Sequence, residues 1–250
     1  MRDRAHVRGR IVLLVLTLGC TPTPEPDLGD DSTMSCEVES PSEVGDLTLH
    51  GQSRCTATLI GSRVALTAAH CLWPPFRGSG EGLAVAFVRG EKRRSFPVRR
   101  ARSFDPEGMT ASDTGLNRDV ALLELADPVP ASLATPRALA SEPVTVGARV
   151  TIVRRGTCEQ SVQARSVWSF HFDPLARDRA LCPGDSGAPL LEGTPAAPGP
   201  IAAVASGYAS TSCAAGAPDQ MLYGDVARLG AAIRAQQLAW LRDPPLRGQR

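Results

Sequence analysis

The sequence has no excess of charge of either sign. Lys and Arg number 27 against 26 Asp and Glu, Lys92 is the only lysine, and no basic run is longer than Lys92-Arg93-Arg94. A protein that binds nucleic acid through its backbone phosphates needs a concentrated basic surface. We therefore expect no nucleic-acid partner.

The sequence also has no apolar run of membrane-spanning length. Its apolar run Ile11 to Leu18 is far shorter than the ~20 residues that a transmembrane helix needs, and four arginines precede it. This pattern predicts an export signal over residues 1–19. The Gly19-Cys20 pair that follows resembles the lipobox of bacterial lipoproteins, although Thr17 stands where leucine is commoner. That resemblance implies lipidation of Cys20 and membrane attachment in the bacterial cell envelope. The alternative is an ordinary cleaved signal peptide and a secreted protein.

No pair of cysteines has the Cys-x-x-Cys spacing, and the chain has only four histidines. A zinc site is therefore not expected, and nothing in the sequence indicates a cofactor. Of the seven cysteines, removal of Cys20 leaves an even set of six. In an exported chain, six cysteines predict three disulfides.

The composition changes along the chain. Residues 20–35 are polar and proline-rich, which predicts a disordered tether, and residues 243–250 are predicted to form a disordered tail. The folded domain is expected over residues 36–242. Within it, short strand-like segments alternate with segments rich in Gly, Pro and Ser, and no internal repeat is visible.

Several of these segments are specific enough to predict strands. A β-hairpin is expected from Thr56 to Thr67, and further strands at residues 83–88, 120–125, 150–153, 162–170, 188–191 and 201–205. Long loops are expected at 102–118, 126–146 and 192–200. One helix is expected at the C-terminus, capped by Asp225 and ending before Pro244. Many short strands with little helix favour an antiparallel barrel or sandwich.

Three short motifs carry residues suited to catalysis. Ser186 lies between Gly184 and Gly187, which allow a tight loop whose N–H groups converge on one point. His70 follows the predicted hairpin and adjoins Cys71, and Asp119 begins an apolar strand. If Asp119 lies beneath His70, it can accept the Nδ1 proton and leave Nε2 free to take the proton of a serine hydroxyl.

In this order and setting, the motifs resemble those of the chymotrypsin/trypsin-like serine peptidases. The matching segments are Thr-Ala-Ala-His-Cys at 67–71, Asp-Val-Ala-Leu-Leu at 119–123 and Gly-Asp-Ser-Gly at 184–187. The resemblance implies two six-stranded antiparallel β-barrels packed face to face, with a C-terminal α-helix. It also implies a serine endopeptidase that acts on proteins or peptides. His70 would be the general base, Asp119 its orienting partner and Ser186 the nucleophile, and the N–H groups of Gly184 and Ser186 would form the oxyanion hole.

The same resemblance implies the disulfides and the specificity pocket. It pairs Cys55 with Cys71 and Cys182 with Cys213, which leaves Cys36 and Cys158 to each other. The expected pocket residues are Ala180, Ser206, Tyr208 and Met221. Because Ala180 stands at the pocket base, no carboxylate is present there to attract Arg or Lys. A preference for small or medium apolar side chains, or a blocked pocket, is the expectation.

The chain departs from the family pattern in its missing activation sequence and in its short loops. No basic residue followed by Ile/Val-Val-Gly-Gly occurs upstream of Cys36, so either Asp185 finds another partner than a new N-terminus or the loop is held without one. A catalytically silent relative that acts as a binding module is the competing hypothesis, although no triad residue is lost. An α/β-hydrolase esterase is disfavoured, because that fold orders its triad Ser, Asp, His within a different serine motif.

Overall fold

The computed structural model describes the parts of the chain that form the folded domain. The described residues are 33–35, 41–72, 80–105, 118–145, 148–153, 159–167, 171–174, 184–194, 196–208 and 221–242, with the backbone alone given for 33–35, 152, 159–167, 171–174, 207–208 and 221–222. Among these residues the fold is almost entirely antiparallel β-structure with one α-helix, α2 (Val226–Arg242). This confirms the predicted all-β fold class with a C-terminal α-helix.

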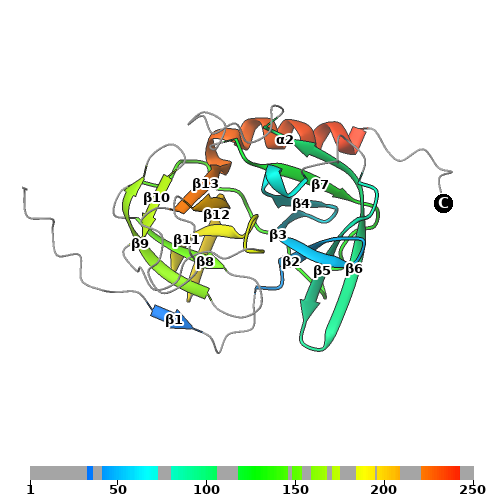
Figure 1. Ribbon diagram of the computed structural model, residues 1–250, viewed down its shortest axis with the longest axis horizontal. Helices are drawn as coiled ribbons and strands as arrows, with labels where there is room; N and C mark the ends of the chain where they lie inside the picture. The colour runs from blue at the N-terminus through cyan, green and yellow to red at the C-terminus, as the bar shows by residue number, and fades with distance from the viewer. Residues whose placement is uncertain are drawn as a thin grey trace, which may run out of the picture.

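The first half of the domain is a closed six-stranded β-barrel (Figure 1). Its hydrogen-bonded order is β2-β3-β4-β7-β6-β5, and each neighbouring pair is antiparallel. The strands are β2 (Val44–Leu49), β3 (Gln52–Gly61), β4 (Val64–Thr67), β5 (Leu83–Arg89), β6 (Lys92–Ser103) and β7 (Ala121–Leu125). The predicted hairpin is β3–β4, with Leu59 paired to Ala65.

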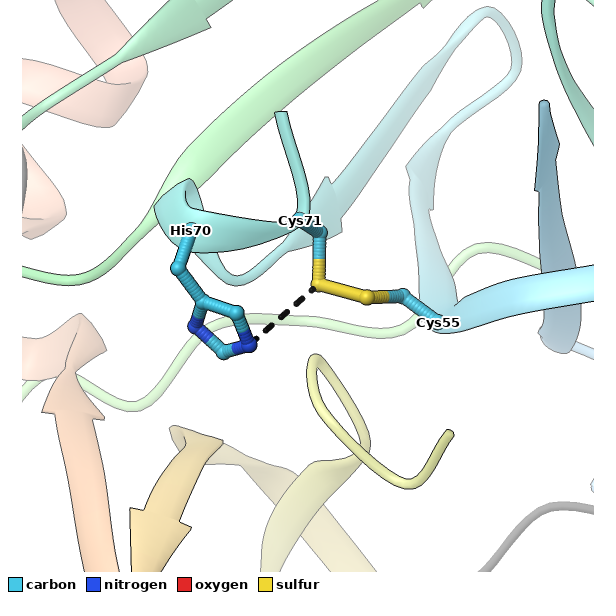
Figure 2. A group of neighbouring side chains, drawn as sticks. All are labelled: Cys55, His70 and Cys71. Carbon is cyan, nitrogen blue, oxygen red and sulfur yellow. Dashed lines mark hydrogen bonds between the residues drawn. A yellow bond between two sulfur atoms is a disulfide. The ribbon is translucent and has the colours of Figure 1, made fainter. Parts of the chain in front are cut away.

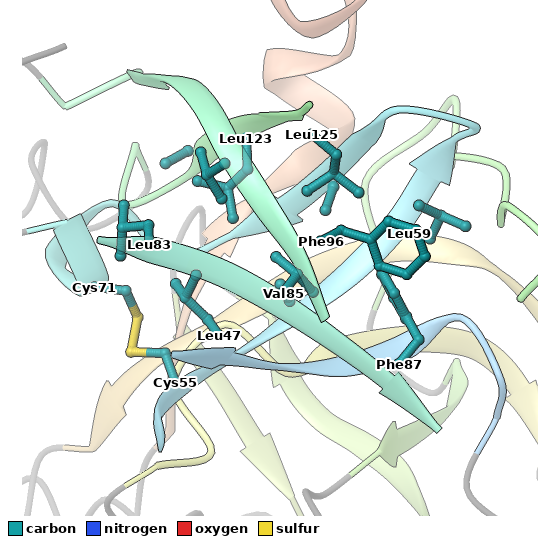
Figure 3. Packing of buried hydrophobic residues seen from close by; sticks show 14 of the residues in the cluster. Leu47, Cys55, Leu59, Cys71, Leu83, Val85, Phe87, Phe96, Leu123 and Leu125 are labelled. Atoms are coloured by element: carbon teal, nitrogen blue, oxygen red, sulfur yellow. A yellow bond between two sulfur atoms is a disulfide. The ribbon is translucent and has the colours of Figure 1, made fainter. Parts of the chain in front are cut away.

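The barrel interior is filled by large aliphatic and aromatic side chains (Figure 3). Phe87 and Phe96 meet edge to face with their ring centroids 6.0 Å apart, an arrangement that aromatic pairs favour. The fully buried residues around them include Leu47, Leu59, Val85, Leu123 and Leu125. The Cys55–Cys71 disulfide lies at one end of this core, so the barrel supports the segment that carries His70.

The second half is a seven-stranded antiparallel sheet. Its order is β1-β9-β10-β13-β12-β11-β8, and β8 also pairs with β9, so six of the strands follow one another in a closed circuit. The strands are β1 (Thr33–Ser35), β8 (Arg149–Val153), β9 (Glu159–Val167), β10 (His171–Pro174), β11 (Pro189–Thr194), β12 (Ala197–Tyr208) and β13 (Met221–Asp225). The two-barrel expectation is thus confirmed for the first barrel. In the second half, β1 adds a seventh strand to the expected six.

Several segments differ from the sequence-based expectations. Residues 192–200 were expected to be a loop, but 192–194 belong to β11 and 197–200 belong to β12, and the two strands pair with each other. Thr33–Ser35, assigned to the tether, pairs with β9. The strands β2, β6, β10 and β13 were not expected. These segments were missed because an edge or hairpin strand needs only paired backbone groups, while prolines, glycines and exposed arginines hide the alternation of its side chains.

The two halves and α2 share one apolar cluster. Leu66, Val120 and Leu122 from the barrel meet residues of the second sheet and of the helix, among them Leu191, Ile201, Val204, Val226 and Ile233. Asp225 caps the helix as expected, because its Oδ1 accepts the N–H of Arg228 at 2.9 Å. At the other end, the Arg100 guanidinium bonds the Trp240 carbonyl and lies over its ring.

Figure 1 shows α2 lying along both halves. Within the described part of the chain, no helix combines the length and the apolar character that a bilayer crossing requires.

Candidate active site

His70 lies on a short 3-10 turn, η1 (Ala69–Leu72), directly after β4. The next residue, Cys71, forms a disulfide with Cys55 on β3, as expected, with the two Cα atoms 6.2 Å apart. Figure 2 shows the imidazole beside this disulfide, with Nε2 3.9 Å from the Cys71 sulfur. The bridge closes a 16-residue separation and ties the histidine turn to the barrel wall.

Asp119 lies just before β7 and is completely buried. Its Oδ1 accepts the backbone N–H of His70 at 2.8 Å, and its Oδ2 is 2.7 Å from Nδ1 of the His70 ring. The hydroxyl of Ser206 also donates to Oδ2. A buried carboxylate needs such donors to offset its lost hydration. The three donors together orient the carboxylate. The carboxylate in turn fixes the tautomer of His70 in which the ring proton is on Nδ1.

Ser186 lies on a tight loop that precedes β11 in the chain and contacts both β12 and the barrel. Gly184 and Gly187 both have positive φ angles, 99° and 84°, which residues with a Cβ rarely adopt. The loop is bonded within itself, from the Ala188 N–H to the Asp185 carbonyl. It is also bonded to the sheet, from the Gly187 N–H to the Ala205 carbonyl, each at 2.8 Å. Gly184 and Gly187 thus allow the tight loop around Ser186 that the sequence predicts.

The Ser186 loop contacts the same two strands that carry the histidine turn. The Ser186 carbonyl accepts the Thr56 N–H at 2.8 Å, and Thr56 directly follows Cys55. A Cβ placed on Gly187 would lie 2.4 Å from Thr67 Oγ1 and 3.1 Å from the Ala68 nitrogen. The loop therefore lies against the residues that lead into His70.

Among the described residues, the side chains of Ser186 and His70 make no hydrogen bond with each other. In substrate-free enzymes such contacts are often long and tighten only in the complex. The arrangement brings together a serine loop, an imidazole and a buried carboxylate. These are the groups that a serine nucleophile with an oriented base requires.

Cys55, His70 and Cys71 offer potential metal-ligand atoms within 4.8 Å of one another. Metal coordination by cysteine needs the thiolate, and here the two sulfurs are bonded to each other. In its oxidised form this group is therefore a disulfide packed beside a histidine (Figure 2).

Asp185 is buried and has the buried phenol of Tyr223 as a neighbour. Burial raises the pKa of Tyr223, and the Asp185 carboxylate raises that pKa further. The phenol consequently stays protonated at neutral pH and keeps its hydrogen. The strand register explains this proximity, because Tyr223 pairs with Ala205, which also bonds the Ser186 loop.

The remaining predicted site residues are placed only in part. The backbone register pairs Tyr208 directly with Met221, and Ser206 is bonded to Asp119. Ala180, the disulfides Cys182–Cys213 and Cys36–Cys158, and the predicted lipidation residue Cys20 lie outside the described residues. Their assignments stay predictions.

A cavity of about 510 Å³ lies elsewhere on the domain, next to the segment that connects the two halves. Arg137 lines it, bonded to the Glu43 carboxylate and to the carbonyls of Pro198 and Gly199. Neither His70 nor Ser186 lines this cavity. These bonds of Arg137 connect Glu43, just before β2, to β12, so we assign Arg137 a structural role.

Sequence reasoning missed two residues that hold the site, Thr56 and Thr67. Both hydroxyls are engaged in it: Thr67 Oγ1 donates to the Thr56 carbonyl at 2.7 Å, and Thr56 Oγ1 donates to the Gly184 carbonyl at 3.1 Å. The available signal was a threonine among small and apolar residues on each strand, Thr56 next to Cys55 and Thr67 at the end of Val-Ala-Leu-Thr. Such a residue needs a hydrogen-bond partner, but the sequence does not say which.

Replacement of Gly187 by alanine is expected to destabilise the fold by more than about 3 kcal/mol and to disrupt the Ser186 loop. The new Cβ would lie 2.2 Å from the Thr56 carbonyl oxygen, and the residue would have to keep a φ of 84°. Gly51→Ala is the matched control, because Gly51 has a φ of 81° but no atom within 4 Å of its added Cβ. That control is expected to lose only about 1–2 kcal/mol. Urea denaturation measures both, and equal losses would contradict the steric argument.

The model of the trypsin family matches residues 37–168, more than half of the chain. The chain therefore belongs to the trypsin family. The matched stretch contains His70 and Asp119 and ends before Ser186. No curated protein matches the sequence.

Two solved structures illustrate the likeness of the fold. Mouse neuropsin, described as a serine protease expressed in the limbic system of the brain, is 18% identical with a TM-score of 0.62, over 79% of this chain and 95% of its own. Human heparin binding protein is 21% identical with a TM-score of 0.61, over 83% of this chain and 95% of its own. At such identities the likeness concerns the fold, and with the family match it supports a serine protease as the general class.

Proposed function

We propose that this protein is an exported serine endopeptidase that cleaves peptide bonds through an acyl-enzyme intermediate. The observation that carries the proposal is the 2.7 Å contact between His70 Nδ1 and Asp119 Oδ2, with the carboxylate fully buried and oriented by two further donors. Such a carboxylate holds the imidazole so that Nε2 can act as a base. The Ser186 loop packs against the same strands.

The proposed reaction has two halves. Ser186 Oγ attacks the peptide carbonyl while His70 Nε2 takes the hydroxyl proton, and the same nitrogen then gives that proton to the leaving amine. Water next attacks the acyl-enzyme, again with His70 as the base, which releases the acid and restores Ser186. The N–H groups of Gly184 and Ser186 stabilise the oxyanion in both halves. Asp119 stays ionised throughout and stabilises the imidazolium.

The proposed substrates are proteins or peptides with small or medium apolar side chains before the cleaved bond. Support comes from Ala180 at the expected pocket base, where trypsin-like specificity would need a carboxylate, and from the pairing of Tyr208 with Met221. Export, with lipidation at Cys20 and attachment to a membrane, is proposed from the N-terminal sequence. The proposed location is the bacterial cell envelope, or the medium if the signal peptide is simply cleaved.

A fluorophosphonate probe tests the proposal on the full-length protein with its disulfides intact. The probe phosphonylates an activated serine and needs little from the specificity pocket. We expect one label per chain in the wild type and none in Ser186→Ala. Absence of labelling in folded, fully oxidised protein would favour the silent binding module. A peptide library then measures the side-chain preference of the labelled protein.

A further inference from the structure

Thr56 makes two hydrogen bonds to the Ser186 loop, one from its backbone and one from its side chain. Its N–H donates to the Ser186 carbonyl at 2.8 Å, and its Oγ1 donates to the Gly184 carbonyl at 3.1 Å. These two bonds hold the loop on both sides of Asp185. Any residue except proline could make the first bond. The second requires a hydroxyl at this position.

The Thr56 hydroxyl holds the carbonyl of a glycine with a left-handed φ. Gly184 has a φ of 99° and no side chain, so its carbonyl can rotate more freely than that of other residues. The Gly184–Asp185 peptide lies between the N–H groups of Gly184 and Ser186. Rotation of this peptide would move the two N–H groups relative to each other. Stabilisation of an oxyanion depends on donors that are held in place before the reaction.

Thr56 is itself held rigidly. It is completely buried, its carbonyl accepts the Thr67 hydroxyl at 2.7 Å, and the close approach of Gly187 fills the space beside it. Thr67 ends β4, three residues before His70. A continuous chain of bonds therefore runs from the histidine segment through Thr56 to Gly184. It couples the position of the base to the position of the oxyanion loop.

The other side of the loop is held by the second sheet. The Gly187 N–H bonds the Ala205 carbonyl, and the buried Asp185 has the protonated phenol of Tyr223 as its neighbour. All of these contacts come from residues between Thr56 and Tyr223. The sequence before Cys36 has no activation motif that would generate a new N-terminus for Asp185.

We infer that Thr56 is a positioning residue for the oxyanion hole. Its hydroxyl keeps the Ser186 loop in its reactive form without an activation cleavage. The inference rests on the proposed function for its catalytic consequence. The holding of the loop itself does not depend on catalysis. Two kinds of measurement are therefore needed, one of reactivity and one of loop order.

The reactivity test compares Thr56→Val, Thr56→Ser and Thr58→Val with the wild type. Valine keeps the shape and the backbone N–H but removes the hydroxyl, and serine restores it. Thr58 is the matched control, because it is equally buried on the same strand and its hydroxyl has no hydrogen-bond partner among the described residues. We measure fluorophosphonate labelling rates, and kcat and KM for a peptide substrate.

For Thr56→Val we expect kcat and the labelling rate to fall by about 10- to 100-fold, less than the hundred- to thousand-fold cost of deleting an oxyanion donor. KM should stay within about twofold, because substrate binding in the ground state does not use the hole. Thr56→Ser should recover most of the rate, and Thr58→Val should equal the wild type. An unchanged Thr56→Val rate, or an equal loss in Thr58→Val, would overturn the inference.

The order of the loop is measured by backbone hydrogen exchange of the segment 184–188 in the same variants. Exchange should accelerate in Thr56→Val and not in Thr56→Ser or Thr58→Val. Hydrogen exchange needs no enzymatic activity, so it tests the role of Thr56 separately from the proposed function. A wild type that is not labelled would refute the proposed function, and the exchange data would still decide the role of Thr56. Equal exchange in all variants would overturn that role.

Discussion

Alanine in place of either Ser186 or His70 is expected to lower kcat about a million-fold, and the double replacement is expected to cost no more than either single one. The two residues act as one unit, because the hydroxyl is a poor nucleophile without the base and the base has no proton to take without the hydroxyl. Once one of them is lost, the other contributes nothing further. The remaining rate comes from substrate binding and the oxyanion hole.

The measurement is steady-state hydrolysis of the best library peptide by the wild type, the two single variants and the double variant. Ser62→Ala serves as a control, since Ser62 is exposed in the turn between β3 and β4. It should match the wild type. Multiplicative losses in the double variant, or a loss below about tenfold in either single one, would show that hydrolysis does not proceed through this pair.

Asparagine in place of Asp119 is expected to lower kcat about 10⁴-fold at neutral pH, the loss that a wrong histidine tautomer causes in triads of this kind. Asp119 now accepts three donors: the His70 N–H at 2.8 Å, the ring Nδ1–H at 2.7 Å and the Ser206 hydroxyl. An amide has one acceptor oxygen and a donor NH₂ group. Its NH₂ group would bond an unprotonated Nδ1 and leave the proton on Nε2, which then cannot accept the proton of Ser186.

The Asp119→Asn variant is examined by kinetics and by thermal unfolding, because Asp119 is buried and its replacement could also weaken the fold. Ser206→Ala is the comparison, since it removes one donor to the carboxylate but leaves the tautomer of His70 unchanged. We expect its kcat to fall far less than that of Asp119→Asn. If the two variants lost the same activity, Asp119 would act through its packing with Ser206 rather than through His70.

The features of the fold and site that depend on neighbouring residues could be predicted from the sequence. Thr-Ala-Ala-His-Cys and Gly-Asp-Ser-Gly combine small residues with one reactive side chain, and the β3–β4 hairpin and α2 follow from local periodicity and capping. The pairing of Cys55 with Cys71 came from the resemblance to a family. Asp119 was singled out by its place at the start of an apolar strand, but its contact with His70 was only a conditional expectation. Periodicity alone would have left both open.

The hydrogen bonds that hold the Ser186 loop join segments that meet only in the folded chain. Thr56 and Gly184 are 128 residues apart, and Ser206 is 87 residues from Asp119. No local pattern indicates that such residues meet, because their contact is set by strand order and register rather than by propensity. The same holds for β6, whose exposed arginines hide its alternation, and for Tyr223, which the β12–β13 register places beside Asp185. The sequence thus determined which chemical groups the protein has, and the tertiary structure decided which of them meet, because that depends on contacts between distant segments.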